Sequence, residues 1–476
     1  MTGLVPSARL CDKAAMFICE SGAPILTAAA MRAAEADAIA AGTAALTLME
    51  RAAAGCARAI LAYAPAARAT VLCGPGNNGG DGYGIALLLQ AAGVAVTVAA
   101  DGLPTAEPAA SMAARWTGPV VPLAQAPAAP LIIDALLGTG LARPLPAAMQ
   151  AALDRLRGGR ARIVAIDIAS GLAADTGAAL GAPLAADLTL ALGAAKPGHV
   201  LGEGAALGGR LAVIDLGIAI PGALSFTARP RLLRPPRDTH KYHRGWVMVV
   251  EGTPGHGGAA GLAGLAALRT GAGLVTLAGS GDHLPALALM RRSDDEAATL
   301  LTDARLGAVV IGPGMAADAR ARGWLKRLRW AGKPIVIDAG ALRLLAAGPI
   351  GAPAVLTPHE GEFTQLFGPV GSDRLAAVQA AARHSGAVVL LKGAATIIAA
   401  PDGRAAINTH AAPWLATAGS GDVLAGMVAA LIAQGLPPFE AAQTAAWLHG
   451  EAGQRLGPGG IADDLVAGLP AVLASL

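Results

Sequence analysis

Cysteine is scarce in this chain of 476 residues, and its distribution argues against both a disulfide framework and a zinc site. The four cysteines are Cys11, Cys19, Cys56 and Cys73, so all lie within the first 73 residues. Their spacing is not that of a metal-binding pair, and no regular framework joins them. We therefore predict reduced thiols, as in proteins of a reducing compartment.

Aromatic residues are also few, at 3% against 54% hydrophobic residues. Alanine supplies much of that apolar content, and Gly, Pro or Gln interrupts each uncharged run before it reaches the length of a membrane span. The first residues include Arg9, Asp12 and Lys13, with no sustained apolar stretch ending in a cleavage site. We expect no membrane association, no secretory signal and a cytoplasmic location.

Charge of one sign is not concentrated anywhere in the chain. The net charge is +3, and no dense basic cluster with interleaved aromatic residues is present, so a nucleic-acid partner is not indicated. Only six of the 36 basic residues are lysines. This scarcity draws attention to Lys196 and Lys392, although composition alone assigns them no role.

The length predicts two domains, because one ordinary hydrophobic core does not extend over this many residues. Between residues 217 and 238 the periodicity stops and prolines gather, which indicates a linker. We predict an N-terminal extension at 1–24, a first domain at 25–230 and a second domain at 231–476.

The first domain alternates helical patterns with short apolar runs. One or two helices are expected within 25–62, and strands at 69–73, 94–99, 131–134, 162–168, 187–192 and 211–214. Residues 74–82 are expected to be a loop that leads into a helix at 83–92. This alternation predicts an α/β domain with a parallel, doubly wound, Rossmann-like sheet.

The second domain shows the same alternation. Strands are expected at 246–250, 308–311, 334–338, 354–356 and 388–391, and a glycine-rich turn at 252–259 leads into a helix that continues through Arg269. A second turn, L-A-T-A-G-S-G-D at 415–422, leads directly into an apolar helix. Glycines at such a turn let the backbone approach a ligand, and the free N–H groups of the helix start attract anions.

Asp422 falls in the first turn of that helix. The helix dipole favours its charged form and leaves it able to accept a proton from a nearby hydroxyl group. An ordinary helix cap would explain Ser420 or Asp422 alone, but it does not require glycines on both sides of Ser420. We interpret this turn as a phosphate site with a base.

A dehydrogenase is one alternative for the first domain. Residues 74–79 satisfy the G-x-G-x-x-G spacing after a strand, and Asp101 follows the next strand. The loop also contains Asn77, Asn78 and Asp81, which a simple pyrophosphate turn does not require. We therefore favour another function for this loop.

The C-terminal half resembles a known family at three motifs. The A-G-S-G-D sequence at 418–422 resembles the anion-hole motif of the ribokinase-like superfamily. Together with T-P-H-E-G-E at 357–362 and K-G-A-A-T at 392–396, it is similar to the nucleotide-dependent NAD(P)H-hydrate dehydratases. The resemblance implies a ribokinase-like α/β/α domain that uses Mg²⁺ and ADP or ATP, with ADP favoured by similarity to the bacterial branch.

The same resemblance implies roles for individual residues. Asp422 is the expected catalytic base. The hydrated substrate is assigned to Ala259, Gly314, His359 and Asp422. The phosphate donor is assigned to Lys392, Gly393, Ala394, Ala395, Thr396, Gly419, Ser420 and Gly421.

The N-terminal half resembles the YjeF N-terminal type of domain, the NAD(P)H-hydrate epimerases. The matching motifs are N-N-G-G-D at 77–81, D-A-L-L-G-T-G-L-A-R-P at 134–144, D-I-A-S-G at 167–171 with A-D-T-G at 174–177, and K-P-G at 196–198. All are expected at strand ends, where loops of an open α/β sheet converge on one crevice.

This second resemblance implies a catalytic Asp167 and a bound potassium ion. The residues assigned to the hydrate are Asn77, Asn78, Gly79, Gly80, Asp81, Gly138, Thr139, Gly140, Leu141, Ala142, Arg143, Pro144 and Asp167. Potassium is assigned to Asn78, Asp134 and Ser170, whose oxygen atoms suit a hard cation. Either aspartate alone would also be explained as a turn-former at a strand end.

Three positions depart from the family patterns. Ala169 replaces the usual proline before Ser170, Glu251 replaces a smaller residue, and the usual glycine is missing within 408–413. We expect changes at the cation site, at the amide end of the substrate and at the lid over the donor, respectively.

The two resemblances together imply a bifunctional enzyme. It would interconvert the R and S hydrates NADHX and NADPHX and would dehydrate the S form at the expense of ADP or ATP, and we expect a homo-oligomer. Two alternatives stay open at this stage. The second domain is a small-molecule kinase whose product keeps its phosphate, or the first domain is a non-catalytic binding or scaffold module.

Overall fold

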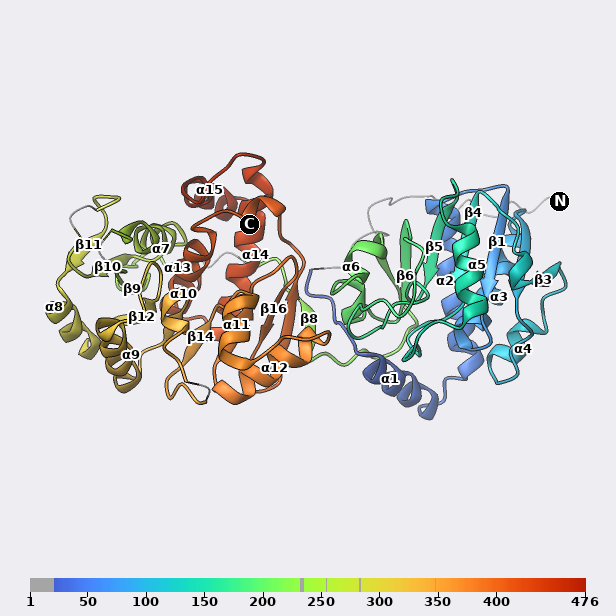
Figure 1. Ribbon diagram of the computed structural model, residues 1–476, viewed down its shortest axis with the longest axis horizontal. Coiled ribbons are helices and arrows are strands. Elements are labelled where there is room, and N and C mark those ends of the chain that lie inside the picture. The colour runs from blue at the N-terminus through green and yellow to red at the C-terminus, as the bar shows by residue number, and fades with distance from the viewer. Residues whose placement is uncertain (1–20, 232–234, 254, 282–283, 347) are drawn as a thin grey trace. The chain divides into compact units, whose positions relative to one another are not determined.

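The computed structural model describes residues 21–231, 235–253, 255–281, 284–346 and 348–476. The predicted extension at 1–24 therefore lies almost entirely outside the described residues, as do Cys11 and Cys19. The described chain forms two compact units, each labelled by its elements in Figure 1. Unit 1 comprises residues 24–222, and unit 2 comprises residues 21–23 and 223–476.

Unit 1 contains a seven-stranded sheet in the order β3-β2-β1-β4-β5-β6-β7. Its strands are β1 (Arg68–Cys73), β2 (Ala95–Ala100), β3 (Val120–Pro122), β4 (Leu131–Ala135), β5 (Arg162–Ile166), β6 (Leu188–Leu192) and β7 (Arg210–Ile214). All neighbouring strands are parallel, which confirms the predicted doubly wound sheet. The strand order reverses between β1 and β4, and ligands bind at such a reversal in open α/β sheets.

Helices cover both faces of this sheet. They are α1 (Ala28–Ala40), α2 (Ala45–Tyr63), α3 (Asn77–Ala91), α4 (Ala109–Ala113), α5 (Ala147–Leu156) and α6 (Gly204–Leu207). Alternate residues of β1 point to opposite faces. Val71 therefore packs in the core formed with α2 and α3, and Leu72 packs in the core formed with α5.

The prediction of a loop at residues 77–82 is wrong, because α3 begins at Asn77. The glycines there remove side chains where the helix meets its neighbours. A Cβ atom on Gly80 would lie 2.8 Å from the Cα of Ala109, and one on Gly82 would lie 2.9 Å from Cys73 Sγ. The glycines thus allow close packing of a helix.

Unit 2 contains a ten-stranded sheet in the order β11-β10-β9-β12-β13-β14-β15-β16-β17-β8. The strands are β8 (Leu224–Phe226), β9 (Trp246–Val250), β10 (Leu274–Ala278), β11 (Met290–Arg292), β12 (Leu306–Ile311), β13 (Ile335–Ile337), β14 (Ala354–Leu356), β15 (Val388–Leu391), β16 (Thr396–Ala399) and β17 (Ala405–Asn408). The sheet is mixed, because β16 runs antiparallel to both β15 and β17. The five predicted strands correspond to β9 and β12 to β15.

The two units divide between Gly222 and Ala223, earlier than the boundary we expected near residue 230. Residues 224–226, which we assigned to the linker, form β8 and pair with β17 at the edge of the second sheet. Leu224 and Phe226 are buried there. Three residues are too few to show a period, which explains why the sequence did not reveal this strand.

One face of the second sheet packs against α7 (Gly257–Arg269), α13 (Ser420–Ala433), α14 (Pro438–Leu456) and α15 (Ala462–Ala474). The remaining helices are α8 (Asp294–Thr299), α9 (Ala319–Ala331), α10 (Ala339–Leu342), α11 (Glu360–Phe367) and α12 (Arg374–Ser385). A Cβ atom on Gly426 of α13 would lie 2.0 Å from the carbonyl oxygen of Ala263 in α7, so the two helix backbones touch. None of the helices among the described residues combines the length and apolar character that crossing a membrane requires.

Candidate active sites

Unit 1 has a cavity of about 670 Å³ at the carboxyl edge of its sheet, beside the reversal between β1 and β4. Most of the predicted epimerase residues line it: Asn77, Asn78, Asp81, Gly138, Thr139, Gly140, Leu141, Ala142, Arg143, Pro144 and Asp167. Gly79 and Gly80 are buried in helix contacts and do not line it. Asp134 and Ser170 are also buried outside the lining.

Asp167 follows β5 with a left-handed backbone, at φ 63°. The Ile168 N–H donates to the Ile166 carbonyl at 2.8 Å, which closes a three-residue γ-turn around Asp167. This conformation is strained for a residue with a side chain, and such strain concentrates at functional sites. The turn ends the strand two residues before the predicted end at residue 168.

The Asp167 carboxylate accepts three hydrogen bonds. The donors are Lys196 Nζ at 2.6 Å and the backbone N–H groups of Thr139 at 3.2 Å and Leu192 at 3.4 Å. Burial alone would raise the pKa of Asp167, but the Lys196 ammonium outweighs burial and the pKa is lowered. Asp167 is therefore an ionised carboxylate inside a buried site.

His199 connects the two strand ends that supply Asp167 and Lys196. The Lys196 backbone N–H donates to His199 Nδ1 at 2.9 Å, so Nε2 carries the proton and donates to the Asp167 carbonyl oxygen at 2.7 Å. Burial and the Lys196 charge lower the pKa of His199 to about 4. The sequence did not point to His199, because its contacts depend on two loops meeting in space.

Of the three predicted potassium ligands, Asp134 and Ser170 contact each other. Asp134 is fully buried, and Ser170 donates to its carboxylate through Oγ at 2.6 Å and through the backbone N–H at 2.8 Å. Burial raises the pKa of Asp134, and the hydrogen bonds from Ser170 and Leu136 oppose this shift. Both polar atoms of the Asn78 carboxamide are buried with no partner among the described residues. A buried anion and an unpartnered carboxamide fit a singly charged ion.

Ala169, in place of the usual proline, is buried directly before Ser170. Ser170 donates to the Asp134 carboxylate through both its backbone N–H and its Oγ.

Unit 2 has a cavity of about 660 Å³ where β15 and α13 meet. Of the residues predicted for nucleotide and substrate, it is lined by His359, Lys392, Gly393, Ala394, Thr396, Ser420 and Gly421. Ala395, Gly419 and Asp422 do not line it. Asn408, residues 411–413 and residues 415–417 also line the cavity, in the region where the family glycine is missing.

The start of α13 has the features of the predicted anion site. Gly419 caps the helix with φ 87°, a conformation that favours glycine. A Cβ atom on Gly421 would lie 3.1 Å from Lys392 Nζ, so the lysine lies directly over the glycine turn. An anion at this turn would meet the helix N–H groups and an ammonium group together.

Asp422 shares a charged cluster with Asp338, Glu362 and Lys392. Lys392 Nζ lies 2.9 Å from Asp338 Oδ1 and 4.0 Å from Glu362 Oε2. Burial and the Asp338 charge raise the pKa of Asp422 to about 6. Asp338 is the strand-end residue after β13 that we did not assign, because its pairing with Lys392 spans 54 positions.

The cluster has an excess of negative charge, since three carboxylates share one lysine. This excess fits a divalent cation that arrives with the donor phosphates. Among the described residues there is no group of three or more His, Cys, Asp or Glu side chains placed to hold a metal by themselves.

His359 caps the start of α11. Its Nδ1 accepts from the backbone N–H groups of Gly361 at 3.0 Å and Glu362 at 3.3 Å, and Glu362 accepts from the His359 backbone N–H at 2.9 Å. The side chain is 59% exposed, and its second ring nitrogen, Nε2, lies 3.4 Å from Glu362 Oε1. Glu360 pairs with Arg374 at 2.8 Å and does not orient His359.

Ser420 is held by a histidine that the sequence did not reveal. His449 in α14 lies 3.1 Å from Ser420 Oγ and 3.0 Å from the Ser420 carbonyl oxygen. Burial lowers the pKa of His449 to about 4, so the ring is neutral.

The other two predicted substrate residues are Ala259, in the first turn of α7, and Gly314, in the loop after β12. A Cβ atom on Gly314 would lie 3.3 Å from the Cβ of Ala259, so these residues are neighbours. Neither lines the adjacent cavity of about 680 Å³ formed around the glycine-rich turn. Glu251 lines that cavity, and its carboxylate pairs with Arg291 at 2.7 Å. The departure at Glu251 thus places an ion pair where the family has a smaller side chain.

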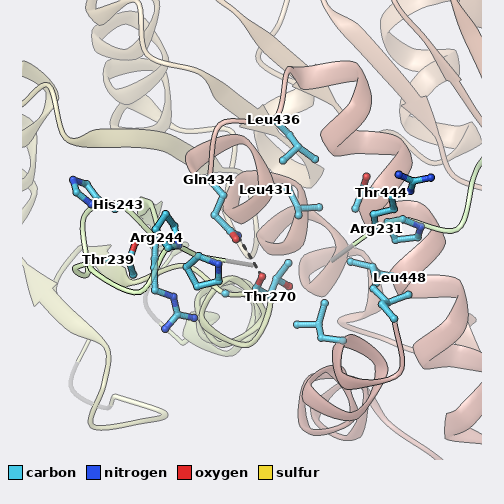
Figure 2. A pocket seen from close by; sticks show the side chains of 16 residues that line it. Arg231, Thr239, His243, Arg244, Thr270, Leu431, Gln434, Leu436, Thr444 and Leu448 are labelled. Atoms are coloured by element: carbon cyan, nitrogen blue, oxygen red, sulfur yellow. Dashed lines mark hydrogen bonds between the residues drawn. The ribbon is translucent and has the colours of Figure 1, made fainter. Parts of the chain in front are cut away.

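A fourth cavity, of about 890 Å³, lies away from all predicted site residues. It lies beside the ends of α7 and α13, at Thr270 and Gln434, whereas the candidate site lies at the starts of these helices. Figure 2 shows leucine side chains and the hydrogen bond from Gln434 to the Thr270 carbonyl. It is therefore separate from the site at the carboxyl edge.

Comparison with known proteins connects both units to one family. Residues 45–198 match the YjeF-related protein N-terminus, and residues 247–460 match the NAD(P)H-hydrate dehydratase family. The chain is 37% identical to the bifunctional NAD(P)H-hydrate repair enzyme Nnr of Salinibacter ruber over 95% of this chain and 96% of that protein. It is 36% identical to the enzyme of the same name from Escherichia coli over 82% and 81% of the two chains.

Among solved structures, the chain is similar to the ADP/ATP-dependent NAD(P)H-hydrate dehydratase of Bacillus subtilis co-crystallised with ATP and Mg²⁺. The identity is 29%, the alignment covers 51% of this chain and 94% of that chain, and the TM-score is 0.46.

The fold, the two strand-end sites and the matched segments define a two-domain α/β enzyme of nucleotide metabolism. A YjeF-related domain precedes a hydrate dehydratase domain in one chain. The chain belongs to the family of bifunctional NAD(P)H-hydrate repair enzymes.

Proposed function

We propose that unit 1 interconverts the R and S hydrates of NADH and NADPH, and that unit 2 dehydrates the S hydrate with ADP or ATP as phosphoryl donor. The assignment of dehydration to unit 2 rests on Asp422. It stands in the first turn of α13, and its neighbours include Lys392, which lies over the glycine turn. ADP is the donor we expect from the resemblance to the bacterial branch.

The chemistry of unit 2 follows from the poor leaving ability of hydroxide. Asp422 accepts the proton of the C6 hydroxyl group as the hydroxyl oxygen attacks the terminal phosphoryl group of the donor, whose P–O bond to the departing AMP or ADP breaks. The N–H groups of residues 419–421 and Lys392 stabilise the charge that develops on the phosphoryl oxygens. The ring nitrogen then expels phosphate, and C5 loses a proton to restore the reduced nicotinamide.

In unit 1, Asp167 would accept the hydroxyl proton at C6, and the residues of the 670 Å³ cavity would hold the dinucleotide. Asn78, Asp134 and Ser170 would hold potassium beside them. Mg²⁺ would enter unit 2 with the donor, near Asp338 and Glu362. The cytoplasmic location and the homo-oligomer stay predictions from the sequence.

A mixture of the hydrate epimers incubated with ADP or ATP tests the proposal. We expect complete recovery of the reduced nicotinamide absorbance, because unit 1 converts the R form that unit 2 does not use. Recovery of only the S fraction would contradict the epimerase assignment. A stable phosphorylated product would instead support the kinase alternative.

A further inference from the structure

Three carboxyl groups, those of Glu35, Asp81 and Asp167, line the cavity of unit 1, and the surroundings of Asp81 and Asp167 are opposite. Asp167 accepts three hydrogen bonds, one of them from Lys196. Asp81 is only 6% exposed, and its carboxyl group makes no hydrogen bond or ion pair with any described residue. A buried carboxylate without a partner is costly, whereas a buried carboxylic acid is tolerated.

The charges around Asp81 favour its neutral form. Burial raises the pKa of Asp81 well above its usual value, and the negative charges of Asp167 and Glu35 raise it further. The titratable or charged groups that face Asp81 or its cavity are Arg32, Glu35, Cys56, Arg143, Asp167 and Lys196. Burial raises the pKa of Cys56 and of Glu35 as well, which favours the neutral forms of both groups.

Pairs of titratable groups whose environments separate their pKa values mark acid and base roles in enzymes. Lys196 supplies the cation that Asp167 needs, and it is bonded to Asp167 and to the Leu192 carbonyl. Asp167 is thus held as a hydrogen-bond acceptor, and Asp81 is left as a donor.

We propose that Asp81 is the general acid of unit 1 and gives a proton to the ring nitrogen N1 of the hydrate while Asp167 accepts the proton of the C6 hydroxyl group. This inference rests on the proposed epimerase function. The C6–N1 bond breaks, its electron pair goes to N1, and C6 becomes a planar aldehyde carbon. After rotation about the C5–C6 bond, N1 attacks the opposite face of C6, N1 returns its proton to Asp81, and the oxygen regains the proton held by Asp167.

The test uses the full chain with Asp81→Asn, and with Asp37→Asn, an exposed carboxylate of α1, as the matched control. Asn matches the neutral carboxyl in shape and keeps a hydrogen-bond donor, but it has no proton to give. We expect kcat for R-to-S conversion to fall by about 10²–10⁴, with KM for the hydrate little changed. Dehydration of pure S hydrate serves as the internal measure of unit 2 and stays at the wild-type rate.

The pH profile supplies an independent readout. In the wild type, the rate of epimerisation falls as pH rises through the pKa of Asp81, because the neutral acid is the active form. The residual activity of Asp81→Asn should lack this alkaline limb of the pH profile. Near-normal kcat in Asp81→Asn, an alkaline limb that persists in it, or unfolding of unit 1 each overturns the inference. Failure of the wild type to interconvert the epimers would overturn the proposed function instead.

Discussion

In unit 1, Nε2 of His199 lies 2.7 Å from the backbone carbonyl oxygen of Asp167 and holds that residue in its left-handed turn. The other ring nitrogen accepts from the Lys196 backbone at 2.9 Å. One neutral imidazole thereby fixes the two residues whose side chains form the buried ion pair of the site.

Replacement of His199 by Phe keeps a ring of similar size but removes both hydrogen bonds. Two buried backbone groups lose their partner, and each such loss costs about 1–3 kcal/mol. We expect a lower midpoint of urea unfolding for unit 1 and slower epimerisation, with a greater effect on kcat than on KM. His199→Gln keeps a hydrogen-bond donor and an acceptor, so it should restore part of kcat. Equal kcat values for His199→Phe and the wild type would contradict the positioning role of His199.

Stability should depend on pH through the same ring. The folded pKa of about 4 lies below the usual value of about 6.5, so the unfolded chain binds the proton first as pH falls. The contribution of neutral His199 is fully present above pH 6.5 and is lost progressively as pH falls toward 4. The difference in unfolding free energy between wild type and His199→Phe should narrow over this window, and a constant difference would show that the ring does not titrate as described.

Asp422→Asn should abolish most dehydration while the fold survives. Loss of a positioned base costs about 10²–10⁴ in rate. In the wild type, the pKa of about 6 means that kcat/KM rises with pH through this value and then levels, because the ionised carboxylate is the active form. Recovery of NADH from the pure S hydrate measures both effects, and near-normal recovery by Asp422→Asn would remove Asp422 from the chemistry.

Asp134→Asn should weaken potassium dependence in unit 1 alone. Asp134 is the only formal charge among the three proposed ligands, so its loss lowers the affinity for the cation. R-to-S conversion should slow most at low potassium, and dehydration of the S hydrate should stay unchanged. Both reactions are measured in potassium-free and potassium-rich buffer. An epimerisation rate that changes neither with potassium nor with the substitution would exclude the cation site.

Each unit should fold and act by itself when the chain is cut between Gly222 and Ala223, since each has its own sheet and core. A fragment of residues 231–476 lacks β8 and uncovers β17. It should unfold at lower urea concentration than residues 223–476, which retain the buried Leu224 and Phe226. Equal midpoints would show that β8 adds nothing, and an inactive but folded 223–476 fragment would contradict independence.

Much of the fold was accessible from sequence because buried parallel strands are continuous apolar runs with functional residues at their ends. Asp134, Asp167, His359 and Lys392 were expected at strand ends, and their roles were implied by the family resemblance. The start of α3 was missed because glycines that permit helix packing look the same as glycines of a loop. Asp338, His199 and His449 were missed because each acts through a contact with a residue that the linear order does not bring near.

The backbones of α7 and α13 meet at Ala263 and Gly426 with no side chain between them. Each of these helices begins at a glycine-rich turn, at Gly257 and at Ser420 respectively. Any side chain at position 426 would push the two helices apart, because its Cβ atom would lie 2.0 Å from the Ala263 carbonyl oxygen. The separation of the two glycine-rich turns therefore depends on a main-chain contact inside the core.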